Sequence, residues 1–454
     1  MPERLELDVL IVGGGQAGIP LAYALVKAGR KVALAESKDL GGSCVNFGCT
    51  PTKAAIASAK VAHMARRASD FGLRIPTMEV DFAAVIGRAH GVALESRNGL
   101  DRGFEKAGGN PELIRGHARF TGREAGRFLL SVGNREIAAS QVVLDTGTRS
   151  AIPPIPGLDG VDFLTSENWL DRTELPSHLA ILGGGYIGLE MGQFYRRMGS
   201  EVTVLDHGGG LLQREDRDVA DALRDLLAAE GIRFELGAKI TRIEKRDRGI
   251  VLACPGTETV ASDLFIATGR TPNTDDLGLE AVGVETDSHG IVKVDERLAT
   301  NVEGVWAAGD IRGGPMFTHT SWDDYRILLS QMAGDRSRTT KRIVPYAVFT
   351  DPELGRVGLT EHEAREQEKK FEVHRFEMKR DGKAREIGEA EGFVKVLIEE
   401  GSGLILGAAV LSAHGSEIVH LYVDVMNAGA PASVIRDAIH IHPTLAEAIQ
   451  SAVT

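Results

Sequence analysis

The 454-residue chain contains 43% hydrophobic and 26% charged residues, the balance of a folded globular protein. At roughly 150 residues per domain, its length predicts about three domains. The net charge of −12 and the dispersed Lys and Arg residues make a nucleic-acid partner unexpected. No apolar run approaches the roughly 18 residues of a membrane span, and the N-terminus has neither the basic region nor the cleavage site of a signal peptide. We therefore expect no membrane insertion and a cytoplasmic location.

The first predicted elements form a strand, turn, helix and strand over residues 7–36, LDVLIVGGGQAGIPLAYALVKAGRKVALAE. Gly13, Gly15 and Gly18 have the G-x-G-x-x-G spacing, and Glu36 ends the second strand. Such glycines allow a tight turn and a close approach to a pyrophosphate, which the N–H groups of the following helix can bind. An acid at the end of the second strand accepts hydrogen bonds from a ribose hydroxyl. The unit therefore predicts a dinucleotide site.

The next motif is GGSCVNFGCTPTK, residues 41–53, which holds two of the three cysteines, Cys44 and Cys49. In an ideal α-helix, residues five apart have Cα atoms roughly 8 to 9 Å apart, beyond the ~7 Å that a disulfide tolerates. The segment is therefore not a regular helix if the two thiols pair. Its glycines permit the distortion, and Pro51 is acceptable in a first helical turn.

Redox chemistry and metal binding are the alternatives for these thiols. A reducing cytoplasm disfavours a structural disulfide. Two cysteines supply only half of a tetrahedral zinc site, and the third, Cys254, lies far along the chain in the strand-like VLACPG. We therefore interpret Cys44 and Cys49 as a redox couple and expect no metal site. Cys254 is interpreted as a small buried hydrophobic residue.

Residues 178–206 repeat the first unit. Gly183, Gly185 and Gly188 have the same spacing, and Asp206 closes the second strand of the repeat. One G-x-G-x-x-G is weak evidence, because a glycine-rich turn between a strand and a helix also explains it. Two copies in the same context, each followed by an acid, indicate that the chain binds two dinucleotides.

The C-terminal third contains FVKVLIEE, a GSG turn, LILGAAVLS and two helical patterns. These indicate an antiparallel α+β unit. The unit ends in HIHPTLAE, residues 440–447. A lone histidine is more often structural than catalytic, so the pattern alone gives neither histidine a role.

Taken together, these motifs resemble the class I pyridine nucleotide-disulfide oxidoreductases, the family of lipoamide dehydrogenase, glutathione reductase and mercuric reductase. The resemblance covers essentially the whole chain and includes GGSCVNFGCTPTK, ATGRTPN, TNVEGVWAAGD and HIHPTLAE. It implies an α/β fold with two Rossmann-like dinucleotide-binding domains and a C-terminal α+β dimerisation domain. The expected domains are an FAD-binding domain at 1–149 and 273–340, an NAD(P)H-binding domain at 150–272 and an interface domain at 341–454.

The same resemblance implies that the first glycine motif holds FAD and the second a reduced nicotinamide nucleotide. Tyr186 would cover the nicotinamide pocket, Asp310 would hydrogen-bond the ribityl chain, and the helix after Asp310 would point its N-terminus at the flavin. NADH is expected over NADPH, because Asp206 would repel a 2′-phosphate and no arginine follows it before Arg214. The expected cofactor-binding residues are Gly13, Gly15, Gly18, Glu36, Lys53, Gly147, Asp310, Gly183, Gly185, Tyr186, Gly188, Asp206 and Gly269.

The resemblance also assigns roles to the thiols and to one lysine. Cys49 would lie nearest the flavin as a thiolate, and Cys44, the more exposed thiol, would attack the substrate. Lys53 would pair with Glu190 near the flavin, the alternative being a solvated surface position.

A histidine near the C-terminus completes the implied site. His442 would be the acid–base residue, and Glu447 would orient its imidazole. The pair would face Cys44 of the other chain in a homodimer with shared active sites. His440 has no such role in the family and is interpreted as structural.

Two departures limit what the resemblance implies about the substrate. Asp145 stands where the family usually has alanine before T-G, and the terminal AIQSAVT lacks the paired cysteines of mercuric reductases. The motifs CTPTK, FTHTSWDDYRIL and HIHPT are most similar to bacterial mercuric-reductase-like and reactive-chlorine-resistance flavoproteins, whose substrates vary.

We therefore expect electrons to pass from NAD(P)H through FAD and the Cys44/Cys49 disulfide to a disulfide or another small oxidant. One alternative is a flavin-only NADH oxidase, peroxidase or transhydrogenase, which the presence of both cysteines disfavours. A subunit of a larger multienzyme complex is another, and it is compatible with the first function.

Overall fold

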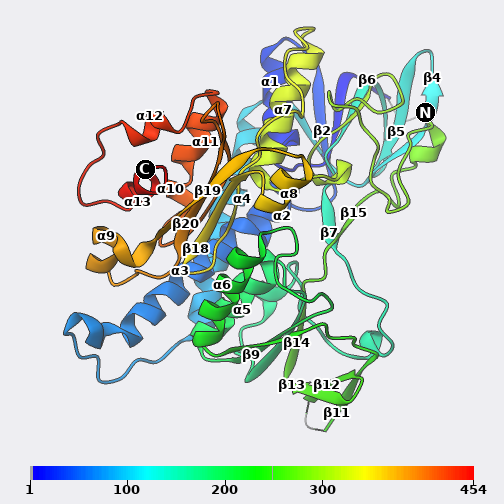
Figure 1. The fold of residues 1–454 in the computed structure, drawn as a ribbon. Coiled ribbons are helices and arrows are strands. Elements are labelled where there is room, and N and C mark those ends of the chain that lie inside the picture. The colour runs from blue at the N-terminus through cyan, green and yellow to red at the C-terminus, as the bar shows by residue number, and fades with distance from the viewer. Residues whose placement is uncertain (1–3, 248) are drawn as a thin grey trace.

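The first sheet contains strands from two separated parts of the chain. The structure, a computed structural model, describes residues 4–247 and 249–454 (Figure 1). The strand order is β3-β2-β1-β6-β5-β4, and β16 adds beside β6. The apolar β1 is parallel to both of its neighbours, as expected for a strand covered on both faces. The strands are β1 (Leu5–Val12), β2 (Val32–Glu36), β3 (Glu112–Arg115), β4 (Ala118–Glu124), β5 (Arg127–Val132), β6 (Arg135–Leu144) and β16 (Val305–Ala307).

Two helices cover one face of this sheet. Helix α1 (Gly18–Lys27) and helix α7 (Thr318–Met332) bury Leu21 and Ile327 in one core with Val9 of β1. Because α7 follows β16, the chain returns to the first sheet after residue 300.

The second sheet is parallel and lies below the first in Figure 1. Its order is β10-β9-β8-β14, and the buried face of helix α6 includes Val219, Leu223 and Leu227, which share a core with this sheet. A separate antiparallel sheet of three strands, in the order β11-β12-β13, follows β10 along the chain. The elements are β8 (His178–Leu182), α5 (Tyr186–Met198), β9 (Glu201–Asp206), α6 (Arg217–Ala229), β10 (Ile232–Leu236), β11 (Arg242–Arg246), β12 (Gly249–Cys254), β13 (Thr257–Ala261) and β14 (Asp263–Ile266).

The chain passes between the two sheets through a pair of short strands. Strand β7 (Thr148–Ser150) leads out of the first sheet, and β15 (Arg270–Pro272) leads back. The two pair antiparallel, with Arg270 opposite Ser150. The exit and the return of the chain therefore lie side by side.

Three helices after β2 join the parts of the molecule. They are the short α2 (Gly42–Asn46), α3 (Cys49–Arg66) and α4 (Phe82–Lys106). One hydrophobic core contains Ala55 of α3, Phe82 of α4, Phe194 of α5, and Leu354 and Phe393 of the C-terminal sheet. Helix α3 is therefore packed against both of the other units.

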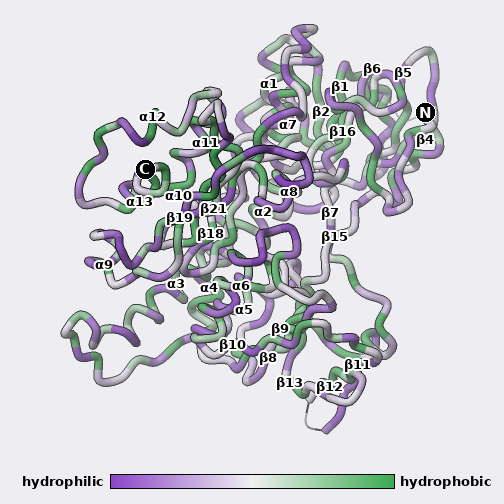
Figure 2. Tube along the Cα trace, in the orientation of Figure 1, coloured by the Kyte–Doolittle hydropathy of each residue, from purple (hydrophilic) through white to green (hydrophobic). Residues whose placement is uncertain are grey.

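The C-terminal unit is an antiparallel sheet of five strands with short helices, as the sequence predicts. Figure 2 shows hydrophobic and hydrophilic residues alternating along the curve between α12 and α13. The elements are β17 (Tyr346–Val348), β18 (Glu353–Gly358), α8 (Glu361–Glu366), β19 (Phe371–Glu377), α9 (Gly382–Glu386), β20 (Phe393–Glu399), β21 (Ile405–Ser412), α10 (Gly415–Ile418), α11 (His420–Asn427), α12 (Ser433–Arg436) and α13 (Ala446–Ser451).

None of the helices within residues 4–247 and 249–454 combines the length and the apolar character needed to cross a lipid bilayer.

Candidate active site

Both glycine motifs form the tight turn that their spacing predicts. Gly13 and Gly183 adopt φ angles of 108° and 111°, which are accessible mainly to glycine. A Cβ at Gly13 would collide with the carbonyl oxygen of Asp145, and one at Gly183 would collide with that of Ala267. A Cβ at the third glycine of each motif would likewise meet the carbonyl of the first. Each turn thus brings its backbone close to the helix that follows.

The acid at the end of each second strand binds the middle of its glycine turn. Glu36 Oε2 accepts a hydrogen bond from the N–H of Gly14 at 2.7 Å, and Asp206 Oδ2 accepts one from the N–H of Gly184 at 2.7 Å. Both carboxylates therefore lie at the carboxyl edge of their sheet, where ligands bind in such folds. Their bonds to ribose hydroxyls stay a prediction.

The cysteine motif is broken into two helices, which confirms that it is not a regular helix. Helix α2 ends at Asn46, and α3 begins at Cys49. A Cβ at the intervening Gly48 would lie 2.8 Å from the carbonyl oxygen of Ser43. Trp169 fixes the break by donating its indole N–H to the carbonyl of Phe47 at 2.8 Å.

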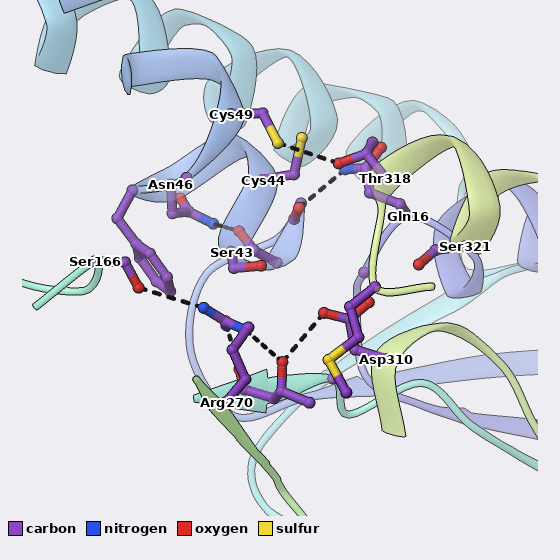
Figure 3. A pocket seen from close by; sticks show the side chains of 18 of the residues that line it. Gln16, Ser43, Cys44, Asn46, Cys49, Ser166, Arg270, Asp310, Thr318 and Ser321 are labelled. Atoms are coloured by element: carbon purple, nitrogen blue, oxygen red, sulfur yellow. Dashed lines mark hydrogen bonds between the residues drawn. The ribbon is translucent and has the colours of Figure 1, made fainter. Parts of the chain in front are cut away.

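The two thiols lie near each other (Figure 3), and their protonation tendencies are opposite. The hydrogen bond from Cys44 lowers the pKa of Cys49 to about 6, and the charge of Lys53 acts in the same direction. The bond to Cys49 and burial raise the pKa of Cys44 above its ordinary value. Thr318, at the start of α7, places its hydroxyl 3.3 Å from Cys49 Sγ. These directions favour Cys49 as the thiolate of the pair and Cys44 as the protonated thiol, and the roles of both stay a prediction.

The exposure of the thiols differs from the expectation. Cys49 is exposed and Cys44 is half-buried, whereas the sequence analysis expects Cys44 to be the more exposed. Cys49 opens from the first turn of α3 onto the main cavity of the molecule, which accounts for its exposure. Both thiols line this cavity, and the more exposed of the two has the lowered pKa.

Lys53 is held in an ion pair instead of standing free at the surface. Its Nζ lies 2.7 Å from Glu190 Oε2 and 4.4 Å from the centre of the Phe349 ring. The other oxygen of Glu190 accepts the backbone N–H of Phe349 at 2.9 Å. The pairing of Lys53 with Glu190 is therefore present, and the alternative of a solvated lysine is wrong.

One cavity of about 930 Å³ connects these groups. It runs from Gly13 and Glu36 past both thiols to Tyr186 and Glu190. Tyr186 begins α5, its ring centre lies 6.0 Å from that of Phe317, and burial raises its pKa to about 12. The cavity therefore links the first glycine motif to the helix that follows the second.

Asp310 lies on the wall of this cavity and is joined to the linking strands. It accepts a hydrogen bond from Thr148 Oγ1 at 3.1 Å, and Arg270 Nε donates to the same hydroxyl at 2.6 Å (Figure 3). Burial raises the pKa of Asp310. Gly147 and Gly269 flank these strands with φ angles of 64° and 123°.

The residues at the first motif fit an FAD-sized dinucleotide. The glycine turn leaves no room for a side chain, α1 points its N-terminus at it, and Glu36 and Asp310 stand at separate points of one long cavity. Gly13, Gly15 and Gly18 would hold the pyrophosphate of FAD. Glu36 would bind its ribose, and Asp310 would bind its ribityl chain.

His442 and Glu447 meet each other but not the thiols. The imidazole Nδ1 lies 3.1 Å from both carboxylate oxygens of Glu447. The His442 side chain is 77% exposed, and among the described residues neither member of this pair lines the cavity that holds Cys44. Within one chain, the dyad is thus formed but separate from the redox pair.

One further interpretation from the sequence needs correction. Cys254 ends β12 in a half-buried position, because the strand runs out into the exposed turn at Pro255; it is not a buried hydrophobic residue. The arginine that reaches the loop after Asp206 is Arg217, whose Nη1 donates to the carbonyl of Gly209 at 3.2 Å, because the loop turns back before α6.

Sequence reasoning did not identify several groups of the site. These are Thr318 beside Cys49, Phe349 beside Lys53, and the pair of Thr148 and Arg270 beside Asp310. Arg270 lies within the ATGRTPN motif, which is the one signal that could have led to it.

Comparison with known proteins assigns the family. The family model of pyridine nucleotide-disulphide oxidoreductases matches residues 7–324, and that of their dimerisation domain matches residues 344–453. The chain belongs to the pyridine nucleotide-disulphide oxidoreductase family. Within this family it is similar to the probable pyridine nucleotide-disulfide oxidoreductase RclA of Escherichia coli K12, with 35% identity over 451 residues and 98% of each chain covered. The dihydrolipoyl dehydrogenase of Cupriavidus necator is 31% identical over 464 residues, covering 98% of this chain and 97% of the other.

A solved structure extends this likeness to the fold. The Cu(II) complex of the HOCl-induced flavoprotein disulfide reductase RclA from Escherichia coli has a TM-score of 0.91 and 34% identity, with 99% of both chains covered. The expected α/β fold with its C-terminal dimerisation domain is therefore confirmed. This family member is an FAD-dependent oxidoreductase that uses NAD(P)H and acts on sulfur groups; a flavin-only function is not favoured.

Proposed function

We propose that electrons pass from a reduced nicotinamide nucleotide at the second glycine motif, through FAD at the first, to Cys44 and Cys49, and then to a small disulfide or another small oxidant. The observation that carries the proposal is the thiolate character of Cys49 in the cavity that begins at the first motif. FAD, when bound there, supplies the transfer of an electron pair between nicotinamide and thiols. The proposed units are 1–149 with 273–340 for FAD, 150–272 for the nicotinamide nucleotide and 341–454 for the interface.

Cys44 needs a base before it can attack a substrate disulfide, because its raised pKa keeps it protonated. We assign this role to His442 of a second copy of the chain, since Glu447 holds Nδ1 and leaves Nε2 free to take the proton. Cys44 sulfur then bonds one substrate sulfur, and the other leaves as a thiol with the proton from His442. The Cys49 thiolate attacks Cys44 sulfur, which releases the second substrate thiolate and restores the Cys44/Cys49 disulfide.

A homodimer with shared sites is supported by the surface next to His442. Ile439 is 102% and Ile441 79% exposed, and both lie in the dimerisation domain. Large apolar side chains at this exposure mark an interaction surface. A second copy covering this surface would bring a dyad toward the thiols that lie far from it in the same chain.

NADH is the proposed nucleotide. Asp206 is buried at the end of β9, and a 2′-phosphate on the adenosine ribose would meet its charge. Arg217 favours NADPH, because its guanidinium group lies on the adjacent loop at Gly209. We give Asp206 the greater weight, since its carboxylate is fixed by the backbone N–H of Gly184, whereas Arg217 is largely exposed.

The electron acceptor is proposed as a class, and relatives suggest which members to test. The similar Escherichia coli protein is described as HOCl-induced and as a Cu(II) complex, and other relatives are dihydrolipoyl dehydrogenases. A cytoplasmic location and docking into a multienzyme complex also stay predictions; the second is tested by co-purification with acyltransferase subunits.

The deciding experiment measures NADH oxidation by the purified flavoprotein with lipoamide, glutathione disulfide, Cu(II) or a reactive chlorine oxidant as acceptor. We expect Cys44→Ser to lose turnover with the true acceptor but to keep flavin reduction by NADH. Cys254→Ser, at a half-buried thiol outside the cavity lining, is the control and should keep both. Full turnover in Cys44→Ser would contradict electron transfer through the thiols.

A further inference from the structure

Asp145 caps the helix of the first glycine motif from a distant part of the chain. It follows directly after β6, and its side chain is 6% exposed. Its Oδ2 accepts a hydrogen bond from the N–H of Gly18 at 2.7 Å. Gly18 begins α1, and the residue before it, Ala17, provides no side-chain cap. Asp145 therefore satisfies one of the N–H groups that a helix leaves unpaired at its start.

The carboxyl group fills the space between the glycine turn and the segment before α7. A Cβ at Gly15 would lie 2.7 Å from Asp145 Oδ2, and one at Gly309 would lie 2.7 Å from Oδ1. Asp145 also lines the main cavity together with Gly13 and Gly15. Its side chain is thus packed beneath the turn that faces the proposed FAD pyrophosphate.

The charges that face Asp145 are negative. Burial raises the pKa of Asp145 well above its ordinary value, although the N–H groups of Gly18 and Ala17 act to lower it; the carboxylates of Asp310 and Asp324 act in the same direction as burial. The nearby cations are directed elsewhere: Arg312 and Arg342 bind Asp324 at 2.7 and 2.6 Å. Among the described residues, no Lys or Arg forms an ion pair with Asp145, which has the backbone N–H groups of Ala17 and Gly18 as its partners.

We propose that Asp145 is a positioning residue of the FAD site that works as a neutral carboxylic acid, holding the start of α1 against β6 through Gly18. This inference rests on the proposed assignment of the first motif to FAD. An ionised carboxylate here would place another negative charge beside the doubly negative pyrophosphate and would offset the positive end of α1. The neutral acid keeps the cap and leaves the helix end available to the cofactor.

Two substitutions test separately the hydrogen bond that Asp145 accepts from Gly18 and the charge of the Asp145 carboxyl group. Asp145→Asn keeps an oxygen that accepts from Gly18 and has no charge, whereas Asp145→Ala removes the acceptor. The test measures the rate at which diluted holoprotein releases flavin, followed by the rise of flavin fluorescence. We expect Asp145→Asn to release FAD within about threefold of the wild-type rate and Asp145→Ala to release it about tenfold faster, as for the loss of a helix cap.

The matched control is Asp295→Asn. Asp295 also accepts two backbone N–H groups, from Arg297 at 2.8 Å and Ala299 at 2.9 Å, but it is exposed and lies outside the main cavity. Its substitution should leave flavin release unchanged. A second measurement compares infrared spectra of wild-type and Asp145→Asn holoprotein, in which the carbonyl band of a protonated acid should be lost in the variant.

Three results would overturn the role of Asp145. The first is FAD release at least tenfold slower in Asp145→Asn than in the wild type, which would mean that wild-type Asp145 is ionised. The second is a rate of FAD release in Asp145→Ala equal to that of the wild type. The third is a wild-type infrared spectrum without the carbonyl band of a protonated acid. If Asp145→Asn does not fold, Asp145→Ser, another uncharged capping residue, replaces it under the same criteria. Wild-type protein that contains no FAD would overturn the proposed function as well, so the two failures are distinguishable.

Discussion

The ammonium nitrogen of Lys53 lies 2.7 Å from Oε2 of Glu190, a carboxylate that is 3% exposed and belongs to the second glycine unit. The same nitrogen lies over the ring of Phe349, which precedes β18 of the C-terminal unit. Three parts of the chain thus fix one positive charge at the first turn of α3. That charge is close enough to lower the pKa of Cys49.

The first prediction concerns this charge. Removing it in Lys53→Met should raise the pKa of Cys49 above its value of about 6, because a neighbouring cation stabilises the thiolate. The thiolate fraction near neutral pH should then fall. The pH dependence of alkylation of the reduced protein by iodoacetamide measures it. Lys60→Met, on the same helix but paired with Asp351 and Glu389, should leave the midpoint unchanged; an unshifted midpoint in Lys53→Met would refute the coupling.

The second prediction concerns the colour of the reduced protein. The protein should be yellow as purified, and two-electron reduction without oxygen should produce a long-wavelength absorption from the Cys49 thiolate next to oxidised FAD. Cys49→Ser should lack this band, whereas Cys44→Ser should show it already before reduction, because Cys49 then has no disulfide partner and the charge of Lys53 still favours its thiolate. Persistence of the band in Cys49→Ser would show that the assignment is wrong.

The third prediction concerns nucleotide choice. The kcat/KM for NADH should exceed that for NADPH at least about tenfold, which corresponds to roughly 1.4 kcal/mol of repulsion by Asp206. Asp206→Ser should narrow the ratio, because it removes both the repulsion of the 2′-phosphate of NADPH and an acceptor for the ribose hydroxyls of NADH. Arg217→Met should lower NADPH use alone, since Arg217 lies on the loop next to the same ribose position. A preference of the wild type for NADPH would contradict the prediction and would mean that Arg217 has a larger effect than Asp206.

The fourth prediction concerns the shared site. Cys44→Ser and His442→Ala chains, each inactive alone in disulfide turnover, should regain activity when denatured and refolded together. With random pairing about half of the dimers are mixed and each carries one intact site, so roughly a quarter of the wild-type activity is expected. Mixed dimers that are demonstrably present but inactive would contradict a site built from two chains.

The sequence predicts those parts of the site that depend on neighbours along the chain. Two glycine spacings place the turns at Gly13 and Gly183, because the turn, the strand before it and the helix after it lie within one short segment. The break between Cys44 and Cys49 follows from the reach of a disulfide and the pitch of a helix. His442 and Glu447 lie five residues apart, and their contact is local as well.

The remaining contacts join distant segments and leave no local pattern. Thr318 lies 269 residues from Cys49, and Asp145 lies 127 residues from Gly18. The sequence shows Asp145 as an unusual residue before T-G, but its partner is set by how β6 lies beside β1. The exposure of Cys49 likewise depends on the shape of the cavity, which several elements form together.

The adjacent strands β7 and β15 make the second glycine unit an insertion in the first unit, so a rigid-body swing about these two strands would be the simplest way to open the site. The shared core opposes that motion. Phe194 of the insertion packs in one cluster with Ala55 of α3 and Leu354 of β18, and a swing would expose this apolar contact to water. We therefore expect access to the thiols from the second glycine unit to depend on side chains such as Tyr186, which lines the cavity. A rearrangement of such side chains leaves the core intact, so we expect catalytic turnover with little change in overall molecular dimensions.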